Sequence, residues 1–206
     1  DALPIYDKEF FDTANGGNYD IQYLPVRLSE QTALLAQGSQ IVCCFVNDGL
    51  NAQVLSQLKN LGVRLIALRC TGFNNVDIPE AKSLGLHVCR VPDYSPYAVA
   101  EHAVALILDL NRNIHRAHNR IRENDYSLDG LLGFDLHGKV VGVIGGGKIG
   151  RAFIRIMQGF GCTVLLADPY LQEDAGTAVQ SVDLDHVLKN SDIISLHCPL
   201  TPETYH

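Results

Sequence analysis

The chain has 206 residues, of which 47% are hydrophobic and 19% are charged, and its formal net charge is −7. This length suits two modest domains or one large one, and the composition is ordinary for a soluble globular enzyme. The negative charge argues against a nucleic-acid partner, because phosphates are attracted by a positive field. The sequence has no apolar run of about 18 residues and no basic-then-apolar leader, which predicts a cytoplasmic protein without a membrane segment.

The six cysteines lie inside or beside apolar runs and form no C-x-x-C pair; they are Cys43, Cys44, Cys70, Cys89, Cys162 and Cys198. We interpret them as buried free thiols in a reducing compartment, and expect neither a zinc site nor a disulfide framework. Cys43 and Cys44 are neighbours on an expected strand, so their side chains should face opposite sides of it.

Short apolar runs alternate with amphipathic segments in the first part of the chain. We expect strands at 3–6, 19–24, 40–46, 64–70 and 87–91, and helices at 8–14, 29–36, 51–61 and 78–84. Ser29 is a candidate N-cap for the second of these helices. Five such strands, alternating with helices, predict an open parallel sheet covered on both faces, and right-handed crossovers would make it flavodoxin-like.

Two helices are expected next, at about 97–112 and 114–123. The second carries Arg116, Arg120 and Arg122, which we interpret as a solvated face or a subunit contact in preference to an anion site. His115 and His118 share a face of this helix without a nearby set of carboxylates, so no metal site is expected there.

A glycine motif between two expected strands is the main functional signal. A valine-rich run at 139–144 precedes G-x-G-x-x-G at Gly145, Gly147 and Gly150, and a helix, a strand at 162–167 and Asp168 follow. The first glycine permits a tight turn, the second lets the backbone approach a pyrophosphate, and the third allows close helix packing. Asp168 follows Gly145 by 23 positions, near the ~20 typical of an acid that binds the adenosine ribose. The pattern predicts a dinucleotide site; the alternative is a glycine-rich turn in another α/β protein.

The acid also indicates which dinucleotide is bound. A carboxylate at Asp168 would repel a 2′-phosphate, and no basic residue follows in Asp168-Pro169-Tyr170, so NAD is favoured over NADP. A short helix at 183–189 and a strand at 192–198 come next. Ligands of such folds bind at the carboxyl ends of the strands, so Cys198 and Pro199 should line the cofactor cleft.

Four motifs occur in order along the chain: R-C-T-G-F-N-N-V-D at 69–77, V-P-D-Y-S-P-Y-A-V-A-E-H-A at 91–103, V-I-G-G-G-K-I-G at 143–150 and D-I-I-S-L-H-C-P-L-T-P-E at 192–203. Together they resemble the D-isomer-specific 2-hydroxyacid dehydrogenases, and within that family the fermentative NAD-dependent D-lactate dehydrogenases. The resemblance covers essentially the whole chain. It implies a flavodoxin-like substrate domain at 1–96 and a Rossmann-type NAD-binding domain at 97–206, both with parallel sheets and the second incomplete.

The resemblance also implies roles for individual residues. The Thr71-Gly72 turn would offer backbone N–H groups to the substrate carboxylate, and the Tyr94 hydroxyl would add a donor; the alternative for Tyr94 is a half-buried loop aromatic. The implied cofactor-binding residues are Val99 beside the nicotinamide, Lys148 and Ile149 at the pyrophosphate turn, and Asp168 on the adenosine ribose, together with Gly145, Gly147, Gly150, Cys198 and Pro199.

The family's catalytic Arg, His and Glu have no counterparts here, because in family order all three follow the last motif and would lie beyond His206. A returning C-terminal helix that completes the substrate domain is absent as well. We therefore interpret the chain as an N-terminal portion and assign no catalytic residue within it. His102 and His197 are expected to be structural.

The implied reaction is the NAD-dependent interconversion of pyruvate and D-lactate, in which a histidine protonates the carbonyl oxygen. Two alternatives stay open: another 2-hydroxy acid, longer or phosphorylated, and a non-catalytic NAD sensor that dimerises on the same fold. The family also implies a homodimer or higher homo-oligomer that associates through the helices around 97–123. From the charge, the apolar runs and the residue spacing, we expect no metal, membrane or nucleic-acid partner.

Overall fold

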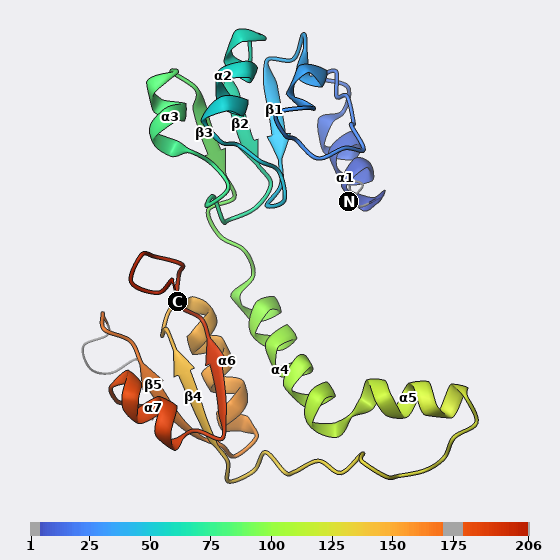
Figure 1. Ribbon diagram of the computed structural model, residues 1–206, viewed down its shortest axis with the longest axis vertical. Helices are drawn as coiled ribbons and strands as arrows, with labels where there is room; N and C mark the ends of the chain where they lie inside the picture. Colours follow the sequence, from blue (N-terminus) through green and yellow to red (C-terminus); the bar gives the residue numbers. More distant parts are fainter. Residues whose placement is uncertain (1–4, 171–178, 206) are drawn as a thin grey trace. The chain divides into compact units, whose positions relative to one another are not determined.

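The computed structural model describes residues 5–170 and 179–205. The chain divides into two compact units, one ending at Tyr94 and the other beginning at Ser95 (Figure 1). Each unit has its own parallel sheet and its own hydrophobic core, so each is described separately.

The first unit is built on a three-stranded parallel sheet. Its strands are β1 (Ile41–Cys44), β2 (Leu65–Leu68) and β3 (His87–Arg90), in the order β1-β2-β3. Helix α2 (Ala52–Asn60) connects β1 to β2, and helix α3 (Ile78–Ser83) connects β2 to β3. Both helices begin at side chains that accept a backbone N–H, Asn51 from Val54 and Asp77 from Glu80. Such caps satisfy donors that have no partner inside a helix.

One face of this sheet packs against α2 and carries the core of the unit. Cys44, Ile66 and Leu68 are buried there with Val54, Leu55 and Leu58 of α2. The alternate side chains point to the opposite face, where Ile41, Cys43, His87 and Cys89 are exposed. The expected opposite orientation of Cys43 and Cys44 is confirmed, and so is the burial of Cys44 and Cys162. The expected burial is wrong for Cys43 and Cys89, because both side chains lie on the face of the sheet opposite to α2 and are exposed there.

The start of the chain differs from the expected strands. Helix α1 (Ile5–Asn15) includes Ile5 and Tyr6, so the strand expected at 3–6 is wrong for these two residues, and its other two lie outside the described part. The segment 19–24 pairs with no described strand. Its ends are tied to α1 instead: the Asn15 side chain accepts the Tyr19 N–H at 2.9 Å, and the Tyr23 hydroxyl donates to Asp12 at 2.8 Å.

The helix expected from Ser29 is reduced to a 3-10 turn, η1 (Ala33–Ala36). The Thr32 hydroxyl accepts the N–H of Ser29 at 2.8 Å and donates to the carbonyl of Arg27 at 2.6 Å. Side-chain bonds of this kind compete with helical bonds and favour turns.

The second unit contains a four-stranded parallel sheet of a doubly wound type. Its strands are β4 (Val140–Ile144), β5 (Thr163–Ala167), β6 (Gln180–Ser181) and β7 (Ile193–Leu196), in the order β6-β5-β4-β7. Helix α6 (Lys148–Gly159) follows β4, and helix α7 (Leu184–Asn190) precedes β7. The chain crosses β4 to place β7 on its other side, and ligands of such sheets bind where the strand order reverses.

Helix α4 (Pro96–Arg112) begins this unit and packs against α6. Ala100 and Val104 of α4 are buried in one cluster with Phe153 and Met157 of α6. Helix α5 (Ile114–Arg122) follows after the left-handed Asn113 and contributes no buried residue. Figure 1 shows α5 extending away from β4 and α6 of this unit. In the part of the chain that the structure describes, no helix is long and apolar enough to cross a membrane.

Candidate functional site

The turn between β4 and α6 has a shape that requires glycine at two positions. Gly145 has φ +99°, and its N–H donates to the Ala167 carbonyl at 2.9 Å. A Cβ atom on Gly145 would lie 2.6 Å from the backbone N of Cys198, and one on Gly150 would lie 2.0 Å from the Gly145 carbonyl oxygen. The first and third glycines of the motif therefore allow the turn, α6 and the end of β7 to pack together.

Gly147 behaves differently, because a Cβ atom there would meet no atom of the described residues within 4 Å. Gly147 is the N-cap of α6 and supplies no side-chain acceptor for the first N–H groups of that helix. These N–H groups and the positive end of the helix dipole are suited to bind a phosphate. The open space at Gly147 fits the close approach of a pyrophosphate to the backbone.

Asp168 follows β5 directly and is half-buried beside this turn. Its Oδ2 accepts the N–H of Gly146 at 2.7 Å, and its Oδ1 accepts the N–H of Tyr170 at 2.8 Å. A carboxylate has about four lone-pair sites, so two acceptor sites remain for further donors such as the hydroxyls of a ribose. The structure thus brings Asp168 and the glycine turn together.

The residues after β7 border the same turn. The N–H of His197 donates to the Ile144 carbonyl at 2.7 Å, next to Gly145, and Cys198 is half-buried while Pro199 is exposed. The His197 ring lies 4.9 Å from the Phe153 ring between centroids, and its Nε2 is 3.0 Å from the Ser195 hydroxyl. Burial lowers the pKa of His197, which favours the neutral imidazole. These contacts are those of a packed histidine.

The other expected cofactor residues lie on α4 and α6. Lys148 is exposed and Ile149 half-buried in the first turn of α6, while Val99 is exposed on α4 beside the buried Ala100. Their contacts with a cofactor stay predictions.

The Thr71-Gly72 turn belongs to the first unit and follows β2. The Arg90 guanidinium donates to the Thr71 carbonyl at 2.9 Å, and the Cys70 thiol donates to the Gly72 carbonyl at 3.2 Å. The Thr71 hydroxyl oxygen is buried without a hydrogen-bond partner among the described residues. Tyr94, at the end of this unit, is 65% exposed, which contradicts the half-buried alternative. The substrate-binding roles of these residues stay predictions.

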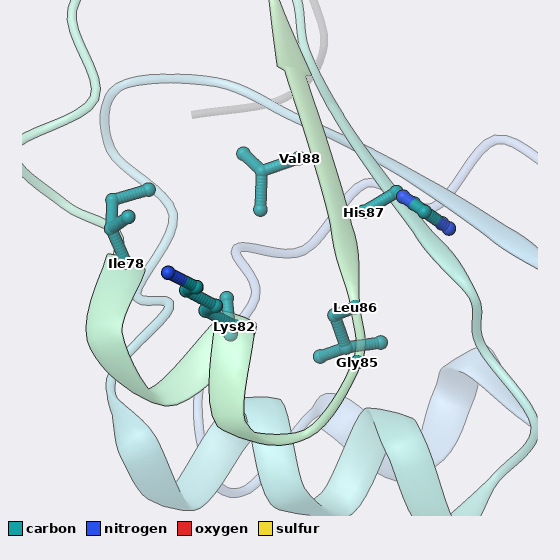
Figure 2. A pocket seen from close by; sticks show the side chains of 7 residues that line it. Ile78, Lys82, Gly85, Leu86, His87 and Val88 are labelled. Carbon is teal, nitrogen blue, oxygen red and sulfur yellow. The ribbon is translucent and has the colours of Figure 1, made fainter.

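A shallow groove of about 350 Å³ lies between α3 and β3 of the first unit. Figure 2 shows Ile78 and Lys82 on α3 and Val88 on β3 around it. None of the expected site residues lines this groove. Among residues 5–170 and 179–205, no three His, Cys, Asp or Glu side chains are grouped to hold a metal ion.

Two arginines that the sequence did not predict as site residues contact the expected sites. Arg90 holds the Thr71 carbonyl, and Arg151 holds the Gly146 carbonyl through its Nε at 3.0 Å. The available signal for Arg151 was a basic residue directly after the last glycine of the motif, on the first turn of the helix.

Known proteins resemble this chain in both sequence and fold. The D-lactate dehydrogenase of Escherichia coli (strain K12) is 51% identical over 203 residues, which are 98% of this chain and 62% of that protein. The apo-structure of D-lactate dehydrogenase from Escherichia coli superposes with a TM-score of 0.90 and 50% identity, over 99% of this chain and 65% of that one. A D-lactate dehydrogenase from Aquifex aeolicus, complexed with NAD and lactic acid, gives a TM-score of 0.83 at 32% identity, over 99% of this chain and 61% of that one.

The chain therefore spans about 60% of the length of these relatives. Residues 104–206 match the family model described as D-isomer specific 2-hydroxyacid dehydrogenase, NAD binding domain. That match includes the glycine turn, α6 and Asp168, the residues whose geometry fits a dinucleotide. The chain belongs to the D-isomer-specific 2-hydroxyacid dehydrogenase family, and the cofactor of its NAD-binding domain is NAD.

Proposed function

We propose that this chain is part of an NAD-dependent dehydrogenase that interconverts pyruvate and D-lactate. One observation carries the proposal: Asp168 accepts the N–H of Gly146 in a G-x-G-x-x-G turn, in a chain that is about half identical to a D-lactate dehydrogenase. Among the solved structures that resemble the chain, a D-2-hydroxyisocaproate dehydrogenase is 28% identical, against 50% for the Escherichia coli lactate enzyme. The higher identity to the lactate enzyme favours pyruvate and D-lactate over a larger 2-hydroxy acid as the substrate pair.

The proposed cofactor site uses the carboxyl ends of β4, β5 and β7. The N–H groups at the start of α6, around Gly147 and Lys148, bind the pyrophosphate, and Asp168 accepts from the adenosine ribose. Ile149, Cys198, Pro199 and, on α4, Val99 complete the contacts. NAD supplies the hydride chemistry when bound, and the residues of this chain bind and orient it.

The proposed substrate contacts belong to the first unit, which ends at Tyr94. We propose that the substrate domain spans residues 1–96. The backbone N–H groups of Thr71 and Gly72 bind the substrate carboxylate, and the Tyr94 hydroxyl adds a further donor. We propose that the Thr71 hydroxyl also contacts the carboxylate, because it is buried without a partner among the described residues and such a group is costly unless a ligand completes it. Arg90 fixes the turn by holding the Thr71 carbonyl.

The general acid of the proposed reaction is not one of the residues described above. His197 is held neutral in a packed position, and His102 lies on the exposed side of α4. We propose that the family's catalytic Arg, Glu and His belong to the part of the relatives' length that this chain does not span.

We also propose that the protein is a homo-oligomer that associates through α4, α5 and the segment after them. Large apolar side chains are exposed along this surface; they are Leu106, Leu110, Ile114, Ile121, Tyr126, Leu128, Leu132 and Phe134. Several large exposed apolar side chains on neighbouring elements are typical of a surface that associates with a partner. Sedimentation of the Leu110→Asp variant tests the proposal: a shift to monomer is expected, and an unchanged mass would contradict it.

The function is tested by titrating the chain with NADH and then adding pyruvate. We expect saturable NADH binding by this chain, and D-lactate formation by the protein at the full length of its relatives. A longer 2-keto acid and NADPH serve as competing ligands. The substrate proposal fails if the full-length protein reduces the longer acid more efficiently than pyruvate, or if it binds NADH without reducing either acid.

A further inference from the structure

The dinucleotide turn contains three consecutive glycines, Gly145, Gly146 and Gly147, which is unusually permissive for a site that must present its N–H groups in one arrangement. Each glycine lacks a Cβ atom and loses more conformational freedom on ordering than any other residue. A ligand that had to order this turn would lose part of its binding free energy to that ordering.

Gly146 is nevertheless held on both sides by side chains from two different elements. Its N–H donates to Oδ2 of Asp168 at 2.7 Å, at the end of β5. Its carbonyl accepts from Nε of Arg151 at 3.0 Å, on the first turn of α6. The backbone N–H of Arg151 also donates to the Gly147 carbonyl at 3.0 Å. Arg151 thus contacts two successive carbonyls of the turn, while Asp168 contacts the opposite end of Gly146.

We propose that Arg151 is a positioning residue for NAD: it keeps the glycine turn in its phosphate-binding shape before the cofactor arrives. This proposal rests on the NAD site proposed above. In this proposal Arg151 affects NAD binding by holding the Gly146 carbonyl, and it does not contact the cofactor directly. The hydrogen bond is charge-assisted and part-buried, the kind that contributes most to holding a backbone group.

The alternative is that Arg151 acts only as a positive charge near the phosphates. Three substitutions separate the two roles, because they place a donor or a charge at different atoms. In Arg151→Gln, Nε2 occupies the same position along the side chain as Nε of Arg, so the hydrogen bond is kept and the charge is lost. In Arg151→Lys the charge is kept, but the donor is one atom further out. Arg151→Met has neither.

Arg155 provides a matched control on the same helix. It lies four residues further along α6 with an exposed side chain. Arg155→Met removes an equal charge from α6 at a site away from the turn. Any long-range effect of charge on cofactor binding should therefore appear in this variant too, and should weaken as salt is added.

The test measures the Kd of NADH by fluorescence titration of the chain and its variants, at low and at raised salt. We expect a Kd about tenfold higher for Arg151→Met, within about threefold of the parent for Arg151→Gln, and within about twofold for Arg155→Met. Arg151→Lys should resemble the Met variant. A second readout needs no cofactor: hydrogen exchange of the amides around 145–148 should be faster in Arg151→Met than in Arg151→Gln.

The outcomes distinguish failure of the positioning role of Arg151 from failure of the proposed NAD binding. If the Lys variant binds NADH as the parent does and the Gln variant binds as the Met variant does, Arg151 acts through charge and the proposal is overturned. Equal Kd values for Arg151→Met and Arg155→Met would overturn it as well, while leaving the NAD site intact. If the parent chain binds no NADH, the proposed function fails, and the positioning role fails with it.

Discussion

Gly145 and Gly150 pack so closely that a Cβ atom on Gly150 would lie 2.0 Å from the carbonyl oxygen of Gly145. The obstacle is backbone, which cannot move aside as the end of a flexible side chain can. The third glycine of the motif therefore serves the packing of α6 against the turn. The second, Gly147, has open space around it and is left for a ligand.

This contrast predicts opposite behaviour for two glycine variants. Gly147→Val should fold as the parent does, because its φ of −66° and ψ of −168° suit any residue and the added Cβ meets no atom in the part of the chain that the structure describes. It should abolish NADH binding by occupying the space of the pyrophosphate. Gly150→Ala should instead lower the free energy of unfolding by about 2 kcal/mol or more, through overpacking. Urea unfolding and NADH titration of both variants measure this. A folded Gly147→Val that still binds NADH would refute our interpretation of the turn.

Asp168→Ala should weaken NADH binding and relax the bias against NADPH. The variant loses both the acceptor for the ribose hydroxyls and the negative charge that repels a 2′-phosphate. It also frees the Gly146 N–H, which Asp168 holds at 2.7 Å, so part of the loss should appear with both cofactors. The ratio of the two Kd values isolates the selectivity. A ratio equal to that of the parent would remove Asp168 from the selection of the cofactor.

The pH dependence of stability should include a contribution from His197. Burial lowers its pKa from 6.5, so between that value and the folded-state pKa the unfolded chain binds more protons than the native one. The stability contributed by the neutral ring is therefore present above about pH 6.5 and is lost as the pH falls through this range. We expect the difference in free energy of unfolding between the parent and His197→Gln to shrink between about pH 8 and about pH 5. A difference independent of pH would contradict this expectation.

Thr71→Val should raise the free energy of unfolding by about 1 kcal/mol, because a methyl group of similar shape replaces a buried hydroxyl that has no partner among the described residues. The same change should weaken substrate binding by the full-length protein if this hydroxyl completes the carboxylate site. Thr71→Ser keeps the hydroxyl and serves as the control. A loss of stability in Thr71→Val would mean that the hydroxyl is already bonded in the free protein.

The second unit was the more predictable of the two, because its signals are local and agree with one another. A valine-rich strand, fixed glycine spacing and an apolar helix face predicted β4, the turn and α6 within a few residues. Helix α4, expected at about 97–112, runs from Pro96 to Arg112, where the capping Ser95 and the left-handed Asn113 define its ends.

The first 40 residues were less predictable, because side-chain bonds outweigh strand and helix preferences there. Nothing in the pattern at 19–24 indicates that Asn15 and Asp12 hold this segment against α1. The contact of Arg151 with Gly146 could not be predicted from the sequence either, because it depends on the side chain of Arg151 turning back toward the start of its own helix. Such contacts follow from the three-dimensional path of the backbone and leave no periodic signal in the sequence.

The most direct test of the account is an NADH titration of this 206-residue chain beside its Gly147→Val variant. We expect saturable binding by the parent and none by the variant, which should unfold at the same urea concentration as the parent. Equal binding by both, or no binding by the folded parent, would contradict a dinucleotide site at the start of α6.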